Sequence, residues 1–428
     1  MSTTAIVLFV TLLVFLVLNV PVGIAIGMSA LCAVLVNPRM TETFVVSQLI
    51  AGSDSFPLMA IPLFILAGEL MASGGVSKRI LNVCNVFFGR ITGGLAIVTV
   101  VVCMFFAAVS GSGPATVAAV GSMVVPTMLE KGYSKSFTLA CVACAGCIGV
   151  IIPPSIPMVI YGTSTGASVS TMFMAGFLPG IMIGVVLCLV CYFYCKKMGW
   201  RGNDEKFTAK QKMHIIIDAI PALIDPIIIL GGIYGGFFTP TESAVIAVVY
   251  GMLVCLAVYR EISGKTLWDI IEATATGTAN LMILVVTAQM FGWLISYYQI
   301  PQAVSAFMLS FVSNKYMFWA IIIILLTICG MFLEVGATNL ILGPILAPIA
   351  GAFGIDPVHF GLVFVFLLAM GQATPPFGTC MFVSCGISQQ PVSKVSKELI
   401  PFVAVEIACA VIFALVPAIS TFLPSIIS

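Results

Sequence analysis

Two short polar stretches interrupt long apolar runs of this chain, and their residue types suit ion binding. The first is Ser110–Thr116 (SGSGPAT), and the second is Glu334–Asn339 (EVGATN), which carries the same Ala-Thr pair 222 residues later. Each stretch is followed at the same distance by two prolines, Pro153-Pro154 and Pro375-Pro376. Because a broken helix in lipid leaves backbone groups without partners, such breaks are costly and favour a polar site at mid-membrane.

The groups freed at these breaks suit two kinds of ligand. The N-terminal ends of half-helices present N–H groups and positive dipole ends to an anion, whereas free carbonyl and hydroxyl oxygens suit a small hard cation. The sequence therefore predicts two pseudo-symmetric cation sites with an anion between them. The first is expected to use Ser110, Ser112, Thr116, Ser155 and the carbonyls around Ile152-Pro153, and the second Glu334, Thr338, Asn339, Thr374 and the Pro375–Gly378 turn.

The composition places these breaks in a membrane protein. Of the 428 residues, 61% are hydrophobic and 8% are charged, whereas a soluble domain has about 25% charged residues. Runs of about 20 apolar residues predict helical spans rather than a β-barrel. The net charge of +1 gives no reason to expect nucleic acid as a partner. The expected partner of this surface is the lipid bilayer.

The apolar runs divide into hairpins, broken helices and simple spans. Residues 91–129 and 317–352 each predict a re-entrant helical hairpin, and residues 138–163 and 359–388 each predict a helix broken at its Pro-Pro pair. The run 5–36 is long for one crossing at about 1.5 Å per residue, so we expect two short spans, with a single crossing as the alternative. The expected simple spans are 5–19, 22–36, 56–73, 170–195, 215–236, 241–259, 273–297 and 399–424, with a polar link around Arg39, Glu42 and Asp54.

A basic segment at 196–214 separates two halves, 1–195 and 215–428. With both hairpins re-entrant, all 17 Lys and Arg residues except Arg39 and Lys315 fall on one side, which the positive-inside rule makes cytoplasmic. The N-terminus is then outside, and the two hairpins open to opposite sides. Because glycines and prolines at the breaks also coincide at the offset of 222, the expected fold is an all-α polytopic membrane protein with an inverted repeat.

Acidic residues inside apolar runs are functional by default. Among Glu69, Asp225, Glu242, Glu334 and Glu406, Glu334 is the best candidate for a site role and Glu69 the next. No Lys or Arg falls at mid-span, so an anion would have to be held by dipoles, hydroxyls and cations. The motifs G-x-x-x-x-G-K-[ST] and H-E-x-x-H are absent from the sequence. We therefore expect no nucleotide cofactor and no enzymatic activity.

Four motifs in this order resemble the large, DctM-like membrane subunit of TRAP transporters, the tripartite ATP-independent periplasmic systems for organic acids. They are Ser110–Thr116, Ile151–Pro157 (IIPPSIP), Phe238–Ser243 (FTPTES) and Thr374–Gly378 (TPPFG). The resemblance covers essentially the whole chain. It implies an elevator-type secondary transporter in a bacterial or archaeal inner membrane, with Na⁺ as the coupling ion. In such a membrane, the N-terminus that the Lys and Arg distribution places outside would be periplasmic.

The resemblance also implies partners and site residues. A periplasmic substrate-binding protein would deliver a small carboxylate, such as a C4-dicarboxylate, a sugar acid or sialic acid. A small four-helix membrane subunit is expected as a separate chain, because this chain begins directly with large-subunit spans. Carried over to this sequence, the first Na⁺ site comprises Ser110, Ser112, Gly113, Ile152, Pro153 and Ser155, and the second Glu334, Gly336, Thr338, Thr374, Pro375 and Gly378. The substrate is expected to contact Ser112, Thr116, Ser155, Thr338, Asn339 and Thr379.

Two alternatives remain at this point. The chain could be a stand-alone ion-coupled carboxylate carrier that needs no binding protein. It could also be a channel or a structural membrane subunit, although a channel would need a continuous pore lining. The inverted hairpins favour alternating access over a pore.

Overall fold

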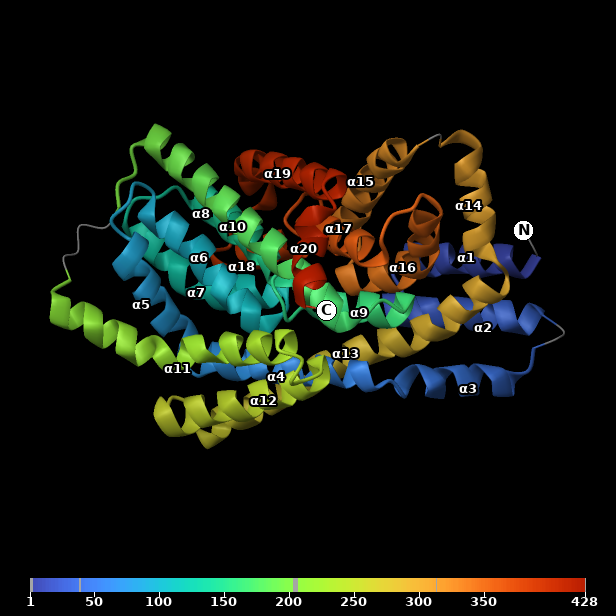
Figure 1. Ribbon diagram of the computed structural model, residues 1–428, viewed down its shortest axis with the longest axis horizontal. Coiled ribbons are helices and arrows are strands. Elements are labelled where there is room, and N and C mark those ends of the chain that lie inside the picture. The colour runs from blue at the N-terminus through green and yellow to red at the C-terminus, as the bar shows by residue number, and fades with distance from the viewer. Residues whose placement is uncertain (1–2, 38–39, 203–206, 313, 428) are drawn as a thin grey trace.

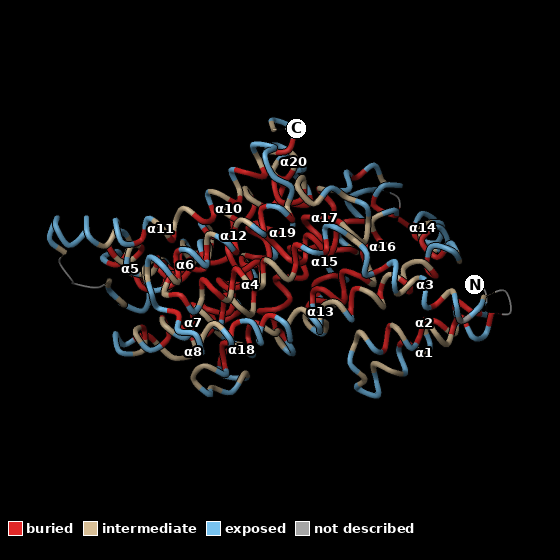
Figure 2. The backbone as a smooth tube through the Cα atoms, turned by 90° about the horizontal axis from the view of Figure 1, so that it is seen from below, coloured by how far each residue is buried: buried red, intermediate tan, exposed pale blue. Residues whose placement is uncertain are grey.

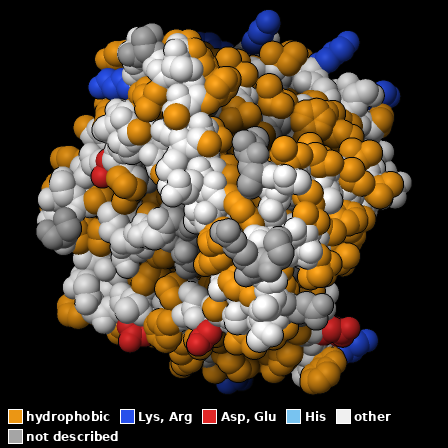
Figure 3. All heavy atoms as spheres, turned by 90° about the vertical axis from the view of Figure 1, so that its right-hand side faces the viewer, with side chains coloured by type: hydrophobic (Ala, Val, Ile, Leu, Met, Phe, Trp, Pro, Cys, Tyr) orange, Lys and Arg blue, Asp and Glu red, His pale blue; other side chains and the backbone are white. Residues whose placement is uncertain are grey.

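The computed structural model describes residues 3–37, 40–202, 207–312 and 314–427, and these ranges form helices without any β-strand. Eight of the described helices are long and apolar enough to cross a membrane. Buried residues fill the middle of the molecule (Figure 2), and the face in Figure 3 is largely apolar, with its charged side chains near the margins. An apolar outer surface suits lipid chains, so the all-helical membrane fold predicted from composition is confirmed.

One set of helices, called here the scaffold group, lies along the lower and right-hand parts of Figure 1. It comprises α1 (Thr3–Val17), α2 (Val22–Val36), α3 (Glu42–Ser53), the 3-10 turn η1 (Phe56–Met59), α4 (Ala60–Ser73), α11 (Ala209–Tyr234), α12 (Pro240–Met252), the π-helical η3 (Leu253–Val258) and α13 (Gly264–Tyr297). The long helix α13 packs against α2, α3 and α4, and α4 also packs against α12. Glycine permits this approach, because a Cβ at Gly27 would lie 2.8 Å from the Thr287 side chain.

A second set, called here the hairpin group, carries the polar stretches. Its first hairpin is α6 (Gly94–Ser110) with α7 (Gly113–Glu130), and its second is α15 (Lys315–Phe332) with α16 (Val335–Ala352). The first broken helix consists of α8 (Lys135–Cys147), η2 (Ile148–Val150) and α9 (Ile156–Thr165), and the second of α17 (Pro357–Gly371) and α18 (Thr379–Ile387). The group also includes α10 (Val169–Met198), α19 (Val392–Leu415) and α20 (Ala418–Ile427). Two arm helices, α5 (Val76–Phe88) and α14 (Ile300–Phe311), connect the scaffold group to the two hairpins.

The order of elements recurs along the chain with nearly constant spacing. Helix α7 begins at Gly113 and α16 at Val335, while α8 begins at Lys135 and α17 at Pro357, an offset of 222 residues in both cases. Arm, hairpin, broken helix and long helix follow one another in the same order in both halves. The opposite orientation of the halves across a membrane, and the division at 196–214, stay predictions.

Each hairpin packs against broken helices from both halves of the chain at the centre of the molecule. Helix α7 packs against α8 of its own half and against α18 of the other half. Helix α16 likewise packs against α17 of its own half and against α9 of the other. This packing brings the tip of each hairpin next to the break in the broken helix of the opposite half.

The expected polar link is largely helical, which corrects the sequence prediction. Helix α3 occupies Glu42–Ser53 and packs against α13. Its middle, residues 44–51, is mostly apolar (FVVSQLIA) and can therefore cover the long helix, although its flanks are polar. Arg39, which the sequence places outside, falls beyond the described residues.

Three helix boundaries also differ from the prediction. The basic segment 196–214 is helical at both ends, since α10 continues to Met198. At its other end, Thr208 and Gln211 form a capping box that starts α11 at Ala209. Helix α13 begins at Gly264 instead of 273, since the Ser263 hydroxyl caps it. The last span, expected over 399–424, stops at Leu415 and resumes as α20 beyond Pro417, a residue that lacks the N–H a continuous helix requires.

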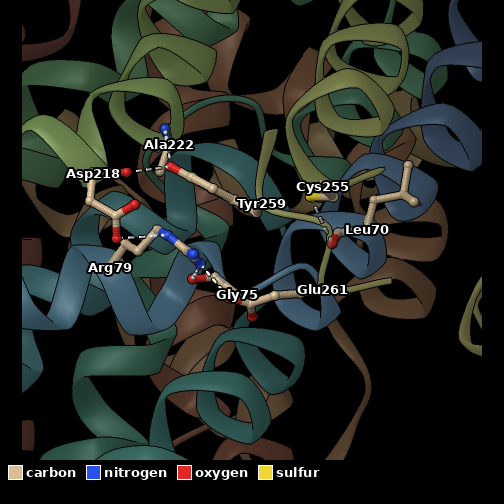
Figure 4. A network of polar contacts seen from close by, with 8 residues as sticks. All are labelled: Leu70, Gly75, Arg79, Asp218, Ala222, Cys255, Tyr259 and Glu261. Atoms are coloured by element: carbon tan, nitrogen blue, oxygen red, sulfur yellow. Dashed lines mark hydrogen bonds and ion pairs between the residues drawn. The ribbon is translucent and has the colours of Figure 1, made fainter. Parts of the chain in front are cut away.

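Arg79 joins the arm helix α5 to the scaffold group (Figure 4). Its guanidinium lies 3.0 Å from the Asp218 carboxylate in α11 and 2.8 Å from the Glu261 carboxylate, which precedes α13. It also lies 3.6 Å from the centroid of the Tyr259 ring, whose hydroxyl donates to the Asp218 carbonyl at 2.8 Å. One planar cation therefore connects three segments that are distant in sequence.

The Arg79→Ala variant is expected to lose about 1–2 kcal/mol of stability in detergent, because partly exposed ion pairs contribute about 1 kcal/mol or less each and the cation–π contact adds to them. Arg79→Lys should recover only part of the loss, since an ammonium cannot reproduce the planar fork. The melting midpoint of the purified protein measures the effect. Lys78→Ala changes the exposed neighbour on the same helix, and an equal loss in that control would contradict a special role for Arg79.

Candidate functional site

Both polar tips and both helix breaks meet at a central cavity of about 170 Å³. Tip 1 (Ser110–Thr116) contributes Ser112 and Gly113, and tip 2 (Glu334–Asn339) contributes Glu334 and Gly336. The other residues that line the cavity are Gly111, Pro114, Val150, Ile156, Pro157, Ile160, Leu281, Val335, Gln372 and Thr379. The cavity therefore joins groups from both halves of the chain.

Tip 1 is held by hydroxyl and carbonyl groups of its own sequence. The Ser110 Oγ lies 2.9 Å from the Thr116 Oγ1, and the Thr116 hydroxyl donates to the Ser112 carbonyl at 2.8 Å. Gly111 has a φ of 60°, a conformation that favours glycine. A Cβ at Gly111 would also lie 2.8 Å from the carbonyl oxygen of Pro154. The glycine thus allows the tip to turn against the first helix break.

The first break is closed by bonds to this tip and by one serine. The Ile156 N–H donates to the Gly111 carbonyl at 3.2 Å. The Ser155 hydroxyl donates to the Val150 carbonyl and also caps the N-terminus of α9. Ser155 is fully buried, so its hydroxyl stabilises the turn between the two half-helices.

Tip 2 is capped by a carboxylate and linked to the other half. The Glu334 carboxylate accepts a hydrogen bond from the Ala337 N–H at 2.8 Å, and the Thr338 hydroxyl donates to the Glu334 carbonyl at 2.9 Å. The Asn339 amide donates to the Pro157 carbonyl at 2.7 Å. Because Pro157 lies in the first turn of α9, this bond connects the two halves of the chain at the cavity.

The two tips differ at equivalent positions, and the difference has chemical consequences. Ser112 and Glu334, 222 residues apart, are the N-cap residues of α7 and α16. Glu334 makes a side-chain cap bond, whereas Ser112 makes none. The N-terminus of α7 therefore presents uncapped N–H groups and a positive dipole end to an anion, while the carboxylate at α16 favours a cation.

The second break brings an amide to tip 1. A Cβ at Gly113 would lie 2.7 Å from the Gln372 Oε1, so the Gln372 side chain reaches the start of α7. The Thr374 hydroxyl donates to the Met370 carbonyl at 3.0 Å, and the chain at Gly378 passes against the Gln372 carbonyl. The second break is thus folded tightly on itself, with Gln372 directed toward the first hairpin.

Two buried oxygens near the centre lack hydrogen-bond partners among the described residues. They are the Asn339 Oδ1 and the Thr379 Oγ1. A buried acceptor without a partner is costly, and a small hard cation prefers such oxygen atoms as ligands. Thr379 lines the central cavity together with Glu334, so these two residues fit a small cation beside tip 2, whereas the Asn339 Oδ1 lies beside Gly343 and Thr165, further along α16.

The structure separates the predicted site residues into three sets. Those that line the central cavity are Ser112, Gly113, Glu334, Gly336 and Thr379. Those that hold its walls through hydrogen bonds are Ser110, Thr116, Ser155, Thr338 and Asn339. The remaining predicted residues, which do not line the cavity either, are Ile152, Pro153, Thr374, Pro375 and Gly378. Ile152 instead lines an apolar cleft of about 740 Å³ between α6, α10 and α11. The ligand roles of all three sets stay predictions.

Several lining residues were missed in the sequence, and two of them, Gln372 and Leu281, show why. Gln372 had a usable signal, because it is an isolated amide at the end of an apolar run, three residues before Pro375. Leu281 had none, since it is one apolar residue within the long apolar helix α13. Only the packing of α13 beside the tips places it at the cavity.

These features define a class of protein: an all-helical, multi-pass membrane protein whose two hairpin tips meet two broken helices. The sequence of residues 9–419 matches the family described as "Tripartite ATP-independent periplasmic transporter, DctM component". The chain therefore belongs to this family of transporter permeases, which confirms the resemblance seen in its motifs.

Individual relatives agree with this assignment. The chain is 42% identical to the isethionate TRAP transporter permease protein DctMQ of Oleidesulfovibrio alaskensis over 97% of its own length, and it spans 66% of that relative. It is 34% identical to the C4-dicarboxylate TRAP transporter large permease protein DctM of Rhodobacter capsulatus, over 99% of both chains. It is 36% identical to the 2,3-diketo-L-gulonate TRAP transporter large permease protein YiaN of Escherichia coli, over 92% of this chain and 95% of the relative.

A solved structure supports the fold alone. The YdaH transporter of Alcanivorax borkumensis superposes with a TM-score of 0.64 over 87% of both chains, at 12% sequence identity. At this identity the likeness speaks for the arrangement of helices and leaves the substrate and the site chemistry open.

Proposed function

We propose that this chain is the large membrane subunit of a Na⁺-coupled, binding-protein-dependent importer of small organic anions. The observation that carries the proposal is the convergence of helix ends at the central cavity. The helices α7, α9, α16 and α18 all begin beside it, and α6, η2, α15 and α17 end beside it. Such a centre supplies N–H groups for an anion and carbonyl groups for cations in one place.

The difference between the two tips suggests where each ligand binds. The uncapped start of α7, with the free Ser112 side chain, is the place for the anionic group of the substrate. Glu334 and Thr379, which line the same cavity, are the place for a Na⁺ ion. A bound Na⁺ would supply positive charge beside the anion, which matters because no Lys or Arg is among the described residues that line the cavity.

The arrangement in two groups supports an elevator motion. The hairpin group would carry the site across the membrane past the scaffold group, and the arm helices α5 and α14 would follow as connectors. We place the N-terminus on the periplasmic side of the inner membrane, in accord with the distribution of Lys and Arg.

The names of the relatives support both the substrate class and the partners. Permeases named for a C4-dicarboxylate, for diketogulonate and for sialic acid match this chain, which favours a small carboxylate. The relative named for isethionate, a small sulfonate, gives a second candidate. We infer that a small four-helix membrane subunit and a periplasmic binding protein complete the transporter.

Uptake into proteoliposomes tests the function. The chain is reconstituted with its small membrane subunit and a matching periplasmic binding protein, and labelled succinate, sialic acid and isethionate are offered with and without an inward Na⁺ gradient. We expect accumulation of one of these anions only when the Na⁺ gradient and both partners are present.

Other outcomes assign the rival functions. Uptake without the binding protein would identify a stand-alone carrier. Downhill flux that ignores Na⁺ would indicate a channel. Absence of Na⁺-driven accumulation for a panel of carboxylates and sulfonates, with both partners supplied, would refute the importer.

A further inference from the structure

A second cavity, of about 440 Å³, lies beside tip 1 and contains an acidic side chain that the central site does not use. Its walls come from α4, α13 and the two arms of the first hairpin, and it shares Ser112, Ile156 and Leu281 with the central cavity. Among the described residues that line it, Glu69 is the only charged one. A ligand that leaves tip 1 through this space must therefore pass one carboxylate.

Glu69 is fixed close to the tip by its neighbour in sequence. A Cβ at Gly68 would lie 3.1 Å from the Cα of Ser110, so α4 touches tip 1 at this point. Helix α4 belongs to the scaffold group and packs against α12 and α13. The carboxylate is therefore presented from the scaffold to the tip of the hairpin.

The Glu69 carboxylate has no hydrogen bond or ion pair with the described part of the chain, and it is half-buried. The other residues that line the cavity are apolar or small, apart from Ser110 and Ser112. A carboxylate in an apolar run without a partner is costly. Because Glu69 lines the cavity, a ligand that enters the cavity meets this carboxylate.

We propose that Glu69 selects ligands by charge during transport: it attracts the coupling cation into the cavity beside tip 1 and opposes binding of the substrate anion from that side. This inference rests on the Na⁺-coupled transport proposed above. The interaction of one fixed charge is opposite in sign for a cation and for an anion. Salt screens it only beyond about 8–10 Å, so it acts within a cavity of this size.

The sign of the effect separates this role from a structural one. If Glu69 merely supported the fold, its replacement would weaken the binding of both ligands. If it acts through its charge, removal of the charge should weaken cation binding and strengthen anion binding. The two half-saturation concentrations therefore have to be measured in the same preparation.

The test uses Glu69→Gln in the reconstituted three-part transporter. With the anion that the wild type accumulates, we expect the Na⁺ concentration for half-maximal uptake to rise about fivefold. We expect the half-saturating anion concentration, measured at saturating Na⁺, to fall by a similar factor, about fivefold, for a charge acting across this cavity. Glu69→Asp keeps the charge and should stay near the wild type in both values.

Controls keep the outcomes distinct. Glu272→Gln removes an exposed carboxylate on α13 and should change neither value, and elution as a single species in size-exclusion chromatography shows that each variant is folded. Unchanged half-saturation values in a folded Glu69→Gln variant, or a shift of both in the same direction, would overturn the role of Glu69 alone. If the wild type shows no Na⁺-dependent uptake, the proposed function fails and this inference falls with it.

Discussion

Asn339→Asp is expected to reduce Na⁺-driven uptake on the order of 100-fold, a larger loss than Asn339→Ala should cause. The Asn339 amide donates to the Pro157 carbonyl at 2.7 Å, and its side chain is fully buried. In Asn339→Ala the carbonyl merely loses its donor, at about 1.4 kcal/mol, near the lower end of the cost of an unsatisfied buried acceptor, which is equivalent to roughly tenfold in an equilibrium. In Asn339→Asp, a buried carboxylate would face that carbonyl, so repulsion and desolvation add to the loss.

The order of the two variants is the informative result. Initial uptake rates in proteoliposomes, corrected for the amount of folded protein, should rank wild type, then Asn339→Ala, then Asn339→Asp. Asn82→Asp introduces the same change at an exposed position on the arm helix α5 and should behave as the wild type. Equal activity of Asn339→Asp and the wild type would show that the link between tip 2 and α9 is not needed for transport.

The positions of the two tips could be predicted from local sequence. Ser110–Thr116 and Glu334–Asn339 combine small residues and hydroxyls within apolar runs, and a helix has few ways to continue through them. The structure ends α6 at Ser110 and starts α7 at Gly113, and it ends α15 at Phe332 and starts α16 at Val335. The helices begin and end where the local chemistry of the backbone requires it.

The partners of each tip could not be predicted in the same way. The sequence predicts that tip 1 pairs with the first break and tip 2 with the second, because these are neighbours along the chain. In the structure, Gln372 from the second break also reaches Gly113 at tip 1, and Pro157 from the first broken helix accepts a hydrogen bond from tip 2. These contacts depend on how helices from different halves pack, and no local sequence pattern predicts them.

Polar segments at the membrane ends were the other source of error. Hydropathy predicts a start at residue 273 for α13 and a polar link in the region of α3, because both regions contain charged or polar residues. A helix that projects beyond the lipid can carry such residues and still begin at a capping side chain, as α13 begins after Ser263. Hydropathy therefore located the apolar helices better than it located their ends.

Gly371→Ala is expected to destabilise the purified protein by about 3 kcal/mol, an overpacking cost, and to abolish most uptake. A Cβ at Gly371 would lie 2.3 Å from the carbonyl carbon of Gly330 and 2.5 Å from its Cα. Carbon atoms pack at about 3.5–4.0 Å, and the atoms in the way belong to backbone, so no side chain can rotate to relieve the contact. Helix α15, the first arm of the second hairpin, would have to separate from α17, the part of the second broken helix on which it packs.

The sign of this effect identifies its cause. In a free helical position, Gly→Ala stabilises by about 0.5–1 kcal/mol because it reduces the entropy lost on folding. Gly292 in α13 is such a position, since nothing lies within 4 Å of its Cβ, so Gly292→Ala should raise the melting midpoint while Gly371→Ala lowers it. Gly330→Ala should fall between them, because its nearest obstacle is the Leu368 carbonyl oxygen at 2.9 Å. A melting midpoint for Gly371→Ala at or above that of Gly292→Ala would mean that α15 and α17 do not pack backbone to backbone, and the second break would then need a different geometry.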